Sequence, residues 1–158
     1  MDELKEQYMT TQFIVVRYGD EQFGIDIKYV DNIVRMQRIT RVPKVQSYIK
    51  GVINLRGEII PVISLRLKMG LADDEITKAT RIIIIKLESG DSIGVLVDAV
   101  EEVVTLEHSQ IEKVAYDSKD KKANFINGVG KDKDRLISLL DVNATFTDKD
   151  GQYQRHYI

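Results

Sequence analysis

The spacing of apolar residues along the chain predicts a series of short β-strands joined by tight turns. β-branched and aromatic residues crowd positions 12–18, and the turn Gly19-Asp20-Glu21 separates them from a second apolar segment at 22–27. Further on, four consecutive isoleucines at 82–85 predict a strand that is buried on both faces. These segments are too short and too β-rich for a helical protein, so the chain is expected to be mainly β.

The middle of the chain predicts a β-hairpin. Residues 48–55 and 58–65 read as its two strands, and Gly57 in the connection can take the positive φ of a tight turn. Pro61 has no N–H to donate to a sheet. Its strand is therefore expected at a sheet edge, or at a bulge.

Two other segments carry apolar residues at the spacing of a helix. An apolar side chain at i, i+3, i+6 and i+7 predicts a short helical turn with one apolar stripe. The first such set is Ile27, Val30, Ile33 and Val34, and the second is Val97, Val100, Val103 and Val104.

The chain also repeats itself. Residues 22–34 (QFGIDIKYVDNIV) align with residues 92–104 (SIGVLVDAVEEVV), and residues 48–65 align with residues 125–142. A unit of roughly 65–70 residues is therefore duplicated, and the groove where the two units meet is the expected place for function. Short strands and tight turns in each copy predict a small closed barrel of about five strands. The expected division is a first barrel at 12–75, a second at 79–146, and flexible or packing tails at 1–11 and 147–158.

Composition narrows the classes of function. A net charge of −2 and a pI of about 5.7 argue against a dedicated nucleic-acid binder, which needs a basic footprint. The chain has no cysteine, so disulfides and thiolate catalysis are excluded. Neither a signal peptide nor an apolar run approaching the ~20 residues of a membrane span is present, so direct membrane insertion is not expected.

The sequence also lacks the groups of residues that the common kinds of catalytic site need. The two histidines, His108 and His156, lie in polar stretches, and no His/Cys set exists that could hold zinc. Neither half contains the Asp-Thr/Ser-Gly of a two-lobed aspartic protease. A non-catalytic binding protein without metal or cofactor is therefore expected.

Four blocks of sequence point to a known family. VPKVQSYIKGVINLRGEIIPVISL (42–65) closely resembles the signature of CheW, the coupling protein of bacterial chemotaxis, and FGIDIKYVDNIV, IGVLVDAVEEVV and INGVGKDKDRLISLLDV are similar to other parts of that family. The resemblance covers about residues 12–146. It implies two tandem SH3-like β-barrels, a cytoplasmic location at membrane-associated receptor arrays, and a link between chemoreceptors and the histidine kinase CheA. Other CheW-like copies are further possible partners, because head-to-tail contacts of this kind close into rings.

The resemblance also implies two sets of contact residues. In the first, a chemoreceptor tip docks in the groove between the barrels, on Val30, Ile33, Gly51, Asn54, Arg56, Val100 and Val103. In the second, the candidate surfaces for the CheA regulatory domain are the turn of the first barrel and loops of the second, at Asp20, Glu21, Ile111, Glu112 and Tyr116. The sequence alone does not separate these positions from ordinary solvent-facing loops.

The residues alone leave other interpretations open. The apolar members of the receptor set could simply fill the core, and Gly51 could, like Gly128 at the equivalent position, simply permit a bulge or a close backbone approach. Arg56 could be a solvated turn residue. A tandem-barrel nucleic-acid module is the alternative function, although aromatic residues make up only 7% of the chain. A hydrolase is the weakest interpretation.

Overall fold

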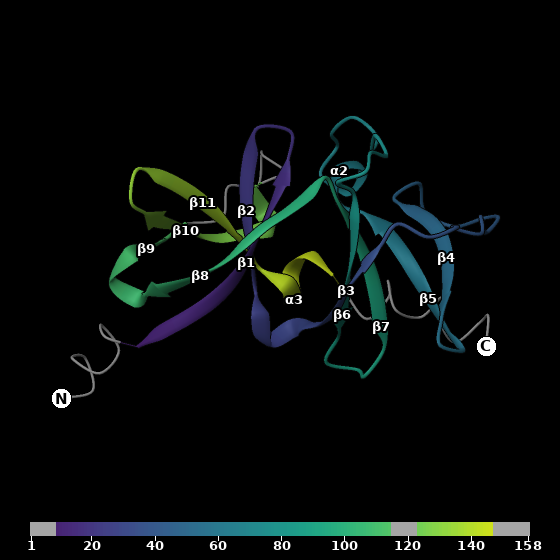
Figure 1. Cartoon of the computed structure of the whole chain (residues 1–158), viewed down its shortest axis with the longest axis horizontal. Helices are drawn as coiled ribbons and strands as arrows, with labels where there is room; N and C mark the ends of the chain where they lie inside the picture. The colour runs from purple at the N-terminus through teal and green to yellow at the C-terminus, as the bar shows by residue number, and fades with distance from the viewer. Residues whose placement is uncertain (1–8, 115–122, 147–158) are drawn as a thin grey trace.

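The computed structural model describes residues 9–114 and 123–146, and in that part the chain is mainly β (Figure 1). Short helical turns connect some of the strands. The elements are β1 (Thr10–Tyr18), β2 (Glu21–Asp26), η1 (Ile27–Tyr29), β3 (Val30–Arg35), β4 (Ile49–Leu55), β5 (Glu58–Ser64), α2 (Leu65–Lys68), β6 (Arg81–Lys86), β7 (Ser92–Val97), β8 (Ala99–Glu107), η2 (His108–Gln110), β9 (Ile111–Lys113), η3 (Ala123–Phe125), β10 (Ile126–Asp132), β11 (Arg135–Leu140) and α3 (Val142–Thr145).

The strands form two sheets that cut across the sequence repeat. The first sheet has six strands in the order β8-β1-β2-β11-β10-β9, and the second has five in the order β3-β6-β7-β5-β4. Each copy therefore gives its first hairpin, β1–β2 or β6–β7, to the sheet that the other copy completes. Parallel pairings fix this exchange, since β2 pairs with β11 and β7 with β5. The expected division into a barrel at 12–75 and another at 79–146 is corrected accordingly.

Each sheet closes on itself through one continuous stretch of chain. In the six-stranded sheet, β8 runs through η2 into β9, so the two edge strands follow each other directly. In the five-stranded sheet, Thr40 lies beyond the end of β3 and bridges Val52 of β4 at the opposite edge. Closure of this kind leaves few free strand edges and gives the two small barrels that the repeat predicted.

The hairpin around Gly57 is confirmed, but Pro61 is placed differently. β5 lies between β7 and β4 in its sheet, so it is not an edge strand. Its pairing with β7 begins only at Val62, one residue after Pro61. The bulge lies on the partner strand instead, between Ile49 and Gly51 of β4.

The predicted helical stripes are strands that each contain a β-bulge. In the first set, only Ile27–Tyr29 forms a 3-10 turn, and Val30 begins β3. The register shifts between Val30 and Asn32, so Val30 and Ile33 pair with Ile85 and Ile83 and share one face of the sheet. The extra residue of the bulge thus places side chains three apart on the same side, which imitates the period of a helix.

The region between the two sheets is filled by a shared apolar core. Residues of β1 and β2, such as Val16 and Phe23, belong to the same buried cluster as Ile63, Ile83 and Val95 of the five-stranded sheet. Figure 1 shows α3 between the two sheets, and its Val142 also belongs to this cluster. Separate, smaller clusters fill the interior of each barrel. A partner can therefore reach only the rim of the seam between the barrels.

Candidate protein-binding surface

Four of the receptor residues implied by the resemblance lie on equivalent faces of β3 and β8. In β8 the register shifts at Val15/Val16, so that Val100 and Val103 pair with Val16 and Ile14, both members of the shared core. β3 has the same arrangement through its own bulge. Both strands therefore turn their paired apolar residues toward the seam between the sheets.

The two residues of each pair differ in depth. Val30 and Val100 are half-buried and pack against the shared core. Ile33 and Val103 lie at the surface, with exposed fractions of 38% and 51%. Core packing therefore accounts for the inner pair, but it does not account for the outer pair, which leaves apolar surface on both strands.

The remaining three implied receptor residues lie on the β4–β5 hairpin. Gly51 is buried with φ +144°, and a Cβ atom there would lie 2.2 Å from the backbone oxygen of Thr40. Asn54 accepts a hydrogen bond from the N–H of Gly57, with the two heavy atoms 3.0 Å apart, and so shapes the turn. Arg56 is exposed at φ 54°, a left-handed conformation that Lys133 repeats in the second hairpin.

These roles separate the hairpin residues. Packing explains Gly51, and turn geometry explains Asn54. Arg56 has no ion-pair partner among the residues that the structure describes. It is the hairpin side chain that remains available to a ligand.

The four implied kinase residues that the structure describes lie in the six-stranded sheet or in the turn between two of its strands, which corrects their assignment to two different barrels. Asp20 and Glu21 are exposed at the β1–β2 turn, and Ile111 and Glu112 lie on the edge strand β9. Ile111 is half-buried and packs against the interior of that barrel, whereas Glu112 forms an exposed ion pair with Lys131 at 3.7 Å. Tyr116 lies outside the described residues.

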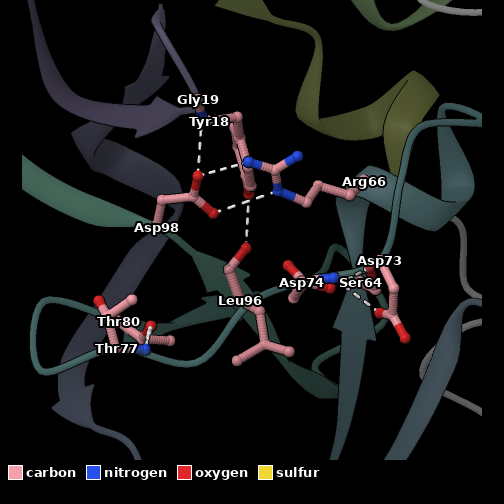
Figure 2. Close-up of polar contacts among 10 residues, drawn as sticks. All are labelled: Tyr18, Gly19, Ser64, Arg66, Asp73, Asp74, Thr77, Thr80, Leu96 and Asp98. Carbon is pink, nitrogen blue, oxygen red and sulfur yellow. Dashed lines mark hydrogen bonds and ion pairs between the residues drawn. The ribbon is translucent and has the colours of Figure 1, made fainter.

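A polar junction that sequence reasoning missed fastens the two barrels together (Figure 2). The Arg66 guanidinium donates to both oxygens of Asp98, at 3.2 Å from Nε and 2.5 Å from Nη2. The N–H of Gly19 donates to the same carboxylate at 2.8 Å. The buried hydroxyl of Tyr18 donates to the backbone oxygen of Leu96 at 2.6 Å. The end of β1 is thereby tied to α2 and to the connection between β7 and β8.

The charges of this junction shift the pKa of its members. Burial alone would raise the pKa of Asp98, but the hydrogen bonds from Arg66 and the Gly19 N–H hold it below its usual value. Burial, reinforced by the charges of Asp74 and Asp98, raises the pKa of Tyr18 well above its usual range. The junction therefore holds an ionised Asp98 and a neutral Tyr18 across a wide pH range.

The segment after α2 is held by two further carboxylates, Asp73 and Asp74. The hydroxyl of Ser64 donates to Asp74, and Lys50 forms an ion pair with Asp73 at 2.8 Å. Burial raises the pKa of Asp74 despite the hydrogen bond from Ser64, and its Oδ1 atom is buried without a partner among the described residues. Nothing in the sequence pattern marks these residues, because each is an ordinary polar residue whose partner is distant in the chain.

Searches for other chemistry add two findings. Within residues 9–114 and 123–146, no group of three or more His, Asp or Glu residues is arranged to hold a metal ion. In the same part of the chain, no helix has the length and apolar character to cross a membrane.

Comparisons with known proteins agree with this architecture. A family model described as the CheW-like domain matches residues 12–150. The chemotaxis protein CheW of Bacillus subtilis is 36% identical over 89% of this chain and 90% of its own length. CheW of Helicobacter pylori is 37% identical over 83% of this chain and 78% of its own length.

A solved structure supports the same relationship. The scaffolding protein TtCheW of Thermoanaerobacter tengcongensis is similar with a TM-score of 0.79 and 33% identity, covering 87% of this chain and 93% of that protein. The mainly β, two-barrel fold and the resemblance found in the sequence are thus both confirmed. This chain belongs to the family of CheW-like domain proteins.

Proposed function

We propose that this protein is a non-catalytic adaptor of bacterial chemotaxis, which couples chemoreceptor signalling tips to the histidine kinase CheA within an array. The observation that carries the proposal is the match to the CheW-like domain over residues 12–150. Relatives named chemotaxis protein CheW and a solved scaffolding protein support it at 33–37% identity. No comparison favours the nucleic-acid alternative.

The receptor contact is proposed at the rim of the seam, on the paired faces of β3 and β8. Ile33 and Val103 expose apolar surface, and Val30 and Val100 lie beneath them against the shared core. An amphipathic helix binds by laying its apolar side on such a surface. Complete burial of a valine or isoleucine side chain contributes about 1.5–3 kcal/mol, and these two are already partly covered, so each contributes about 1 kcal/mol.

Arg56 is proposed as the polar contact of the same receptor surface. Its guanidinium is exposed at the tip of the β4–β5 hairpin and presents donors in a fixed fork. Such a fork grips a carboxylate with two parallel hydrogen bonds. Gly51 and Asn54 would then act indirectly, by shaping the hairpin that presents Arg56.

The CheA contact is proposed on the six-stranded barrel, at the Asp20–Glu21 turn and along β9. Both regions are exposed, and β9 is an edge strand that pairs only with β10 within the described chain. Head-to-tail contacts between related barrels join two different surfaces, and such contacts can close into rings. Further CheW-like copies are therefore proposed as partners alongside CheA.

The test compares two double variants in pulldowns with a receptor signalling tip and, separately, with a CheA regulatory domain. Ile33→Ser/Val103→Ser removes the proposed receptor surface, while Leu71→Ser/Leu136→Ser removes two other exposed apolar side chains, with exposed fractions of 39% and 63%. We expect the first variant to bind the receptor tip about tenfold or more weakly and to retain CheA binding. Equal receptor binding by both variants would refute the proposed surface.

A further inference from the structure

Residues 35–46, the segment that follows β3, repeat a three-residue pattern four times. Their sequence, RMQRITRVPKVQ, places a cation, an apolar residue and a third, uncharged residue in succession. The whole stretch 32–57 contains no Asp or Glu, although the protein as a whole has a net charge of −2. Its equivalent in the second copy, before β10, contains Glu107 and Glu112, so the pattern belongs to one copy alone.

Burial separates the two kinds of residue in this pattern. Beyond Arg35 the segment pairs with a strand only through the bridge at Thr40, and residues 43–45 form a turn and a bend in which Lys44 has φ 61°. All four cations are exposed, and all four apolar residues are half-buried. We call the four cations, Arg35, Arg38, Arg41 and Lys44, the basic stripe.

The apolar residues of the repeat line a hollow in the surface of the protein. It has a volume of about 720 Å³ and is bounded by the repeat, the start of β4 and the segment after α2. Its walls include Met36, Ile39, Val42 and Val45 from the repeat, and Ile76, which is 54% exposed, from the facing segment. A hollow of this size accepts several side chains of a ligand.

The charge around the hollow is positive. Arg41 and Lys44 of the basic stripe stand at its edge. The carboxylates on the facing side, Asp73 and Asp74, are engaged by Lys50 and Ser64. By contrast, no residue of the basic stripe has an ion-pair partner in the described part of the chain. The fold therefore presents a row of cations without ion-pair partners beside a trough that has both polar and apolar side chains in its walls.

We propose that this surface binds an acidic peptide segment of a partner protein, with apolar side chains in the hollow and carboxylates on the basic stripe. Charge complementarity selects the acidic ligand, and the trough selects one that also carries apolar anchors. A single-stranded nucleic acid fits less well, because the repeat contains no aromatic side chain on which bases could stack. A membrane also fits less well, because the apolar residues are half-buried and line the hollow.

Apart from Arg35, which is the last residue of β3, the site lies outside the β3 and β8 residues proposed for the receptor, so its test does not use receptor or kinase. The probe is a fluorescein-labelled peptide of four Glu-Leu-Ser triplets, measured by fluorescence anisotropy with the full chain. Peptides of Glu-Ser-Ser and of Lys-Leu-Ser triplets separate the contributions of the apolar anchors and of the charge. Polyuridylate RNA and vesicles of anionic phospholipid test the two other classes of ligand.

The matched variants are Arg38→Glu/Arg41→Glu/Lys44→Glu and Lys86→Glu/Lys113→Glu/Lys133→Glu. Each reverses three exposed cations, and each includes one residue with a left-handed backbone, Lys44 or Lys133. The variants therefore carry the same net charge and a comparable risk of misfolding, which circular dichroism and thermal melts will compare.

We expect the Glu-Leu-Ser peptide to bind the wild type and the second variant, and to bind the first variant at least about tenfold more weakly. Binding should also weaken several-fold between about 50 and 200 mM salt, because the charges are exposed. The proposal is overturned if the two variants bind equally, if the Glu-Ser-Ser or Lys-Leu-Ser peptide binds as well, or if RNA or vesicles bind more tightly than the peptide.

Discussion

Replacing Gly51 with alanine tests whether this residue serves the fold or a partner. Gly51 lies opposite Val62 at the bulge of β4, beside the bridge that closes the five-stranded barrel. The bridge consists of two backbone hydrogen bonds between Thr40 and Val52, each with an N–O distance of 2.8 Å. A Cβ atom on Gly51 would lie 2.2 Å from the Thr40 oxygen, so the bridge would have to move.

The size of the effect follows from two contributions. A side chain at φ +144° occupies a backbone region that costs about 1–3 kcal/mol. Displacing the bridge weakens two hydrogen bonds worth about 1 kcal/mol each. The expected loss is therefore about 3–5 kcal/mol, a large share of the ~5–15 kcal/mol by which a folded domain is stable. In a melt this corresponds to a fall in Tm of roughly 6–20 °C.

Gly57→Ala is the control, because it has the strain without the clash. Gly57 has φ +85°, and a Cβ atom there would meet nothing within 4 Å. Its expected cost is about 1 kcal/mol. Urea unfolding of both variants, followed by circular dichroism, measures the difference. A loss for Gly51→Ala no larger than that for Gly57→Ala would refute the packing argument. A fully folded Gly51→Ala that fails only to bind the receptor tip would show a direct contact instead.

Three further predictions concern the polar junction and the nearby carboxylate Asp74, and urea midpoints measure each of them. Tyr18→Phe should lower the free energy of unfolding by about 1–2 kcal/mol, because the backbone oxygen of Leu96 loses its buried donor; an unchanged midpoint would contradict this. Asp98→Asn should cost about 1 kcal/mol at pH 7, after allowing for partial exposure. The folded state lowers the pKa of Asp98, so this stabilisation is present above the pKa of the unfolded chain and is lost as pH falls through the folded value, and the difference from wild type should vanish in acid. Asp74→Asn should stabilise the protein at pH 7 or leave its stability unchanged, because the raised pKa of Asp74 means that folding disfavours its ionised form. The stabilisation that Asp74 provides is confined to acid pH and is lost as pH rises through the folded pKa. A clear loss of stability at pH 7 would refute the assignment.

Local features of the fold were predictable because they depend on neighbouring residues. The hairpin at Gly57 follows from one flexible turn residue between two β-rich segments, and the structure gives Gly57 a φ of +85°. The burial of residues 82–85 on both faces follows from an unbroken run of isoleucine. In the structure, Ile83 and Ile85 face the shared core, and Ile82 and Ile84 face the barrel interior.

The prediction of two helical turns with apolar stripes was wrong, because the spacing of apolar residues does not reveal a β-bulge. A bulge at Asp31 in β3 puts Val30 and Ile33 on one face, and a shift opposite Val15/Val16 does the same for Val100 and Val103. Spacing alone does not distinguish a bulged strand from a helical turn. The same spacing does occur in both copies, and it reflects a bulged strand with the same geometry in each copy, not a helix.

The sequence also could not predict which strands pair when they are distant in the chain. The repeat located two copies, but it could not show that each first hairpin joins the other copy's sheet. The Arg66–Asp98 pair could not be found either, because its members lie in different copies and neither belongs to a motif. Ile33 and Val103 were in the predicted set, yet only the structure shows that they remain exposed while Val30 and Val100 do not.

The exchange of hairpins explains how a protein without reactive groups can serve as a connector. Because β1–β2 and β6–β7 each complete the opposite barrel, the chain crosses from one barrel to the other after β2 and again after β7, and the barrels cannot separate without opening the shared core. The junction of Tyr18, Arg66 and Asp98 adds polar contacts across the same seam. The faces of β3 and β8 are therefore held at one fixed spacing, and the outer surfaces of both barrels move with them. A displacement imposed on the seam would therefore move the two barrels together, because the shared core and the polar junction join them.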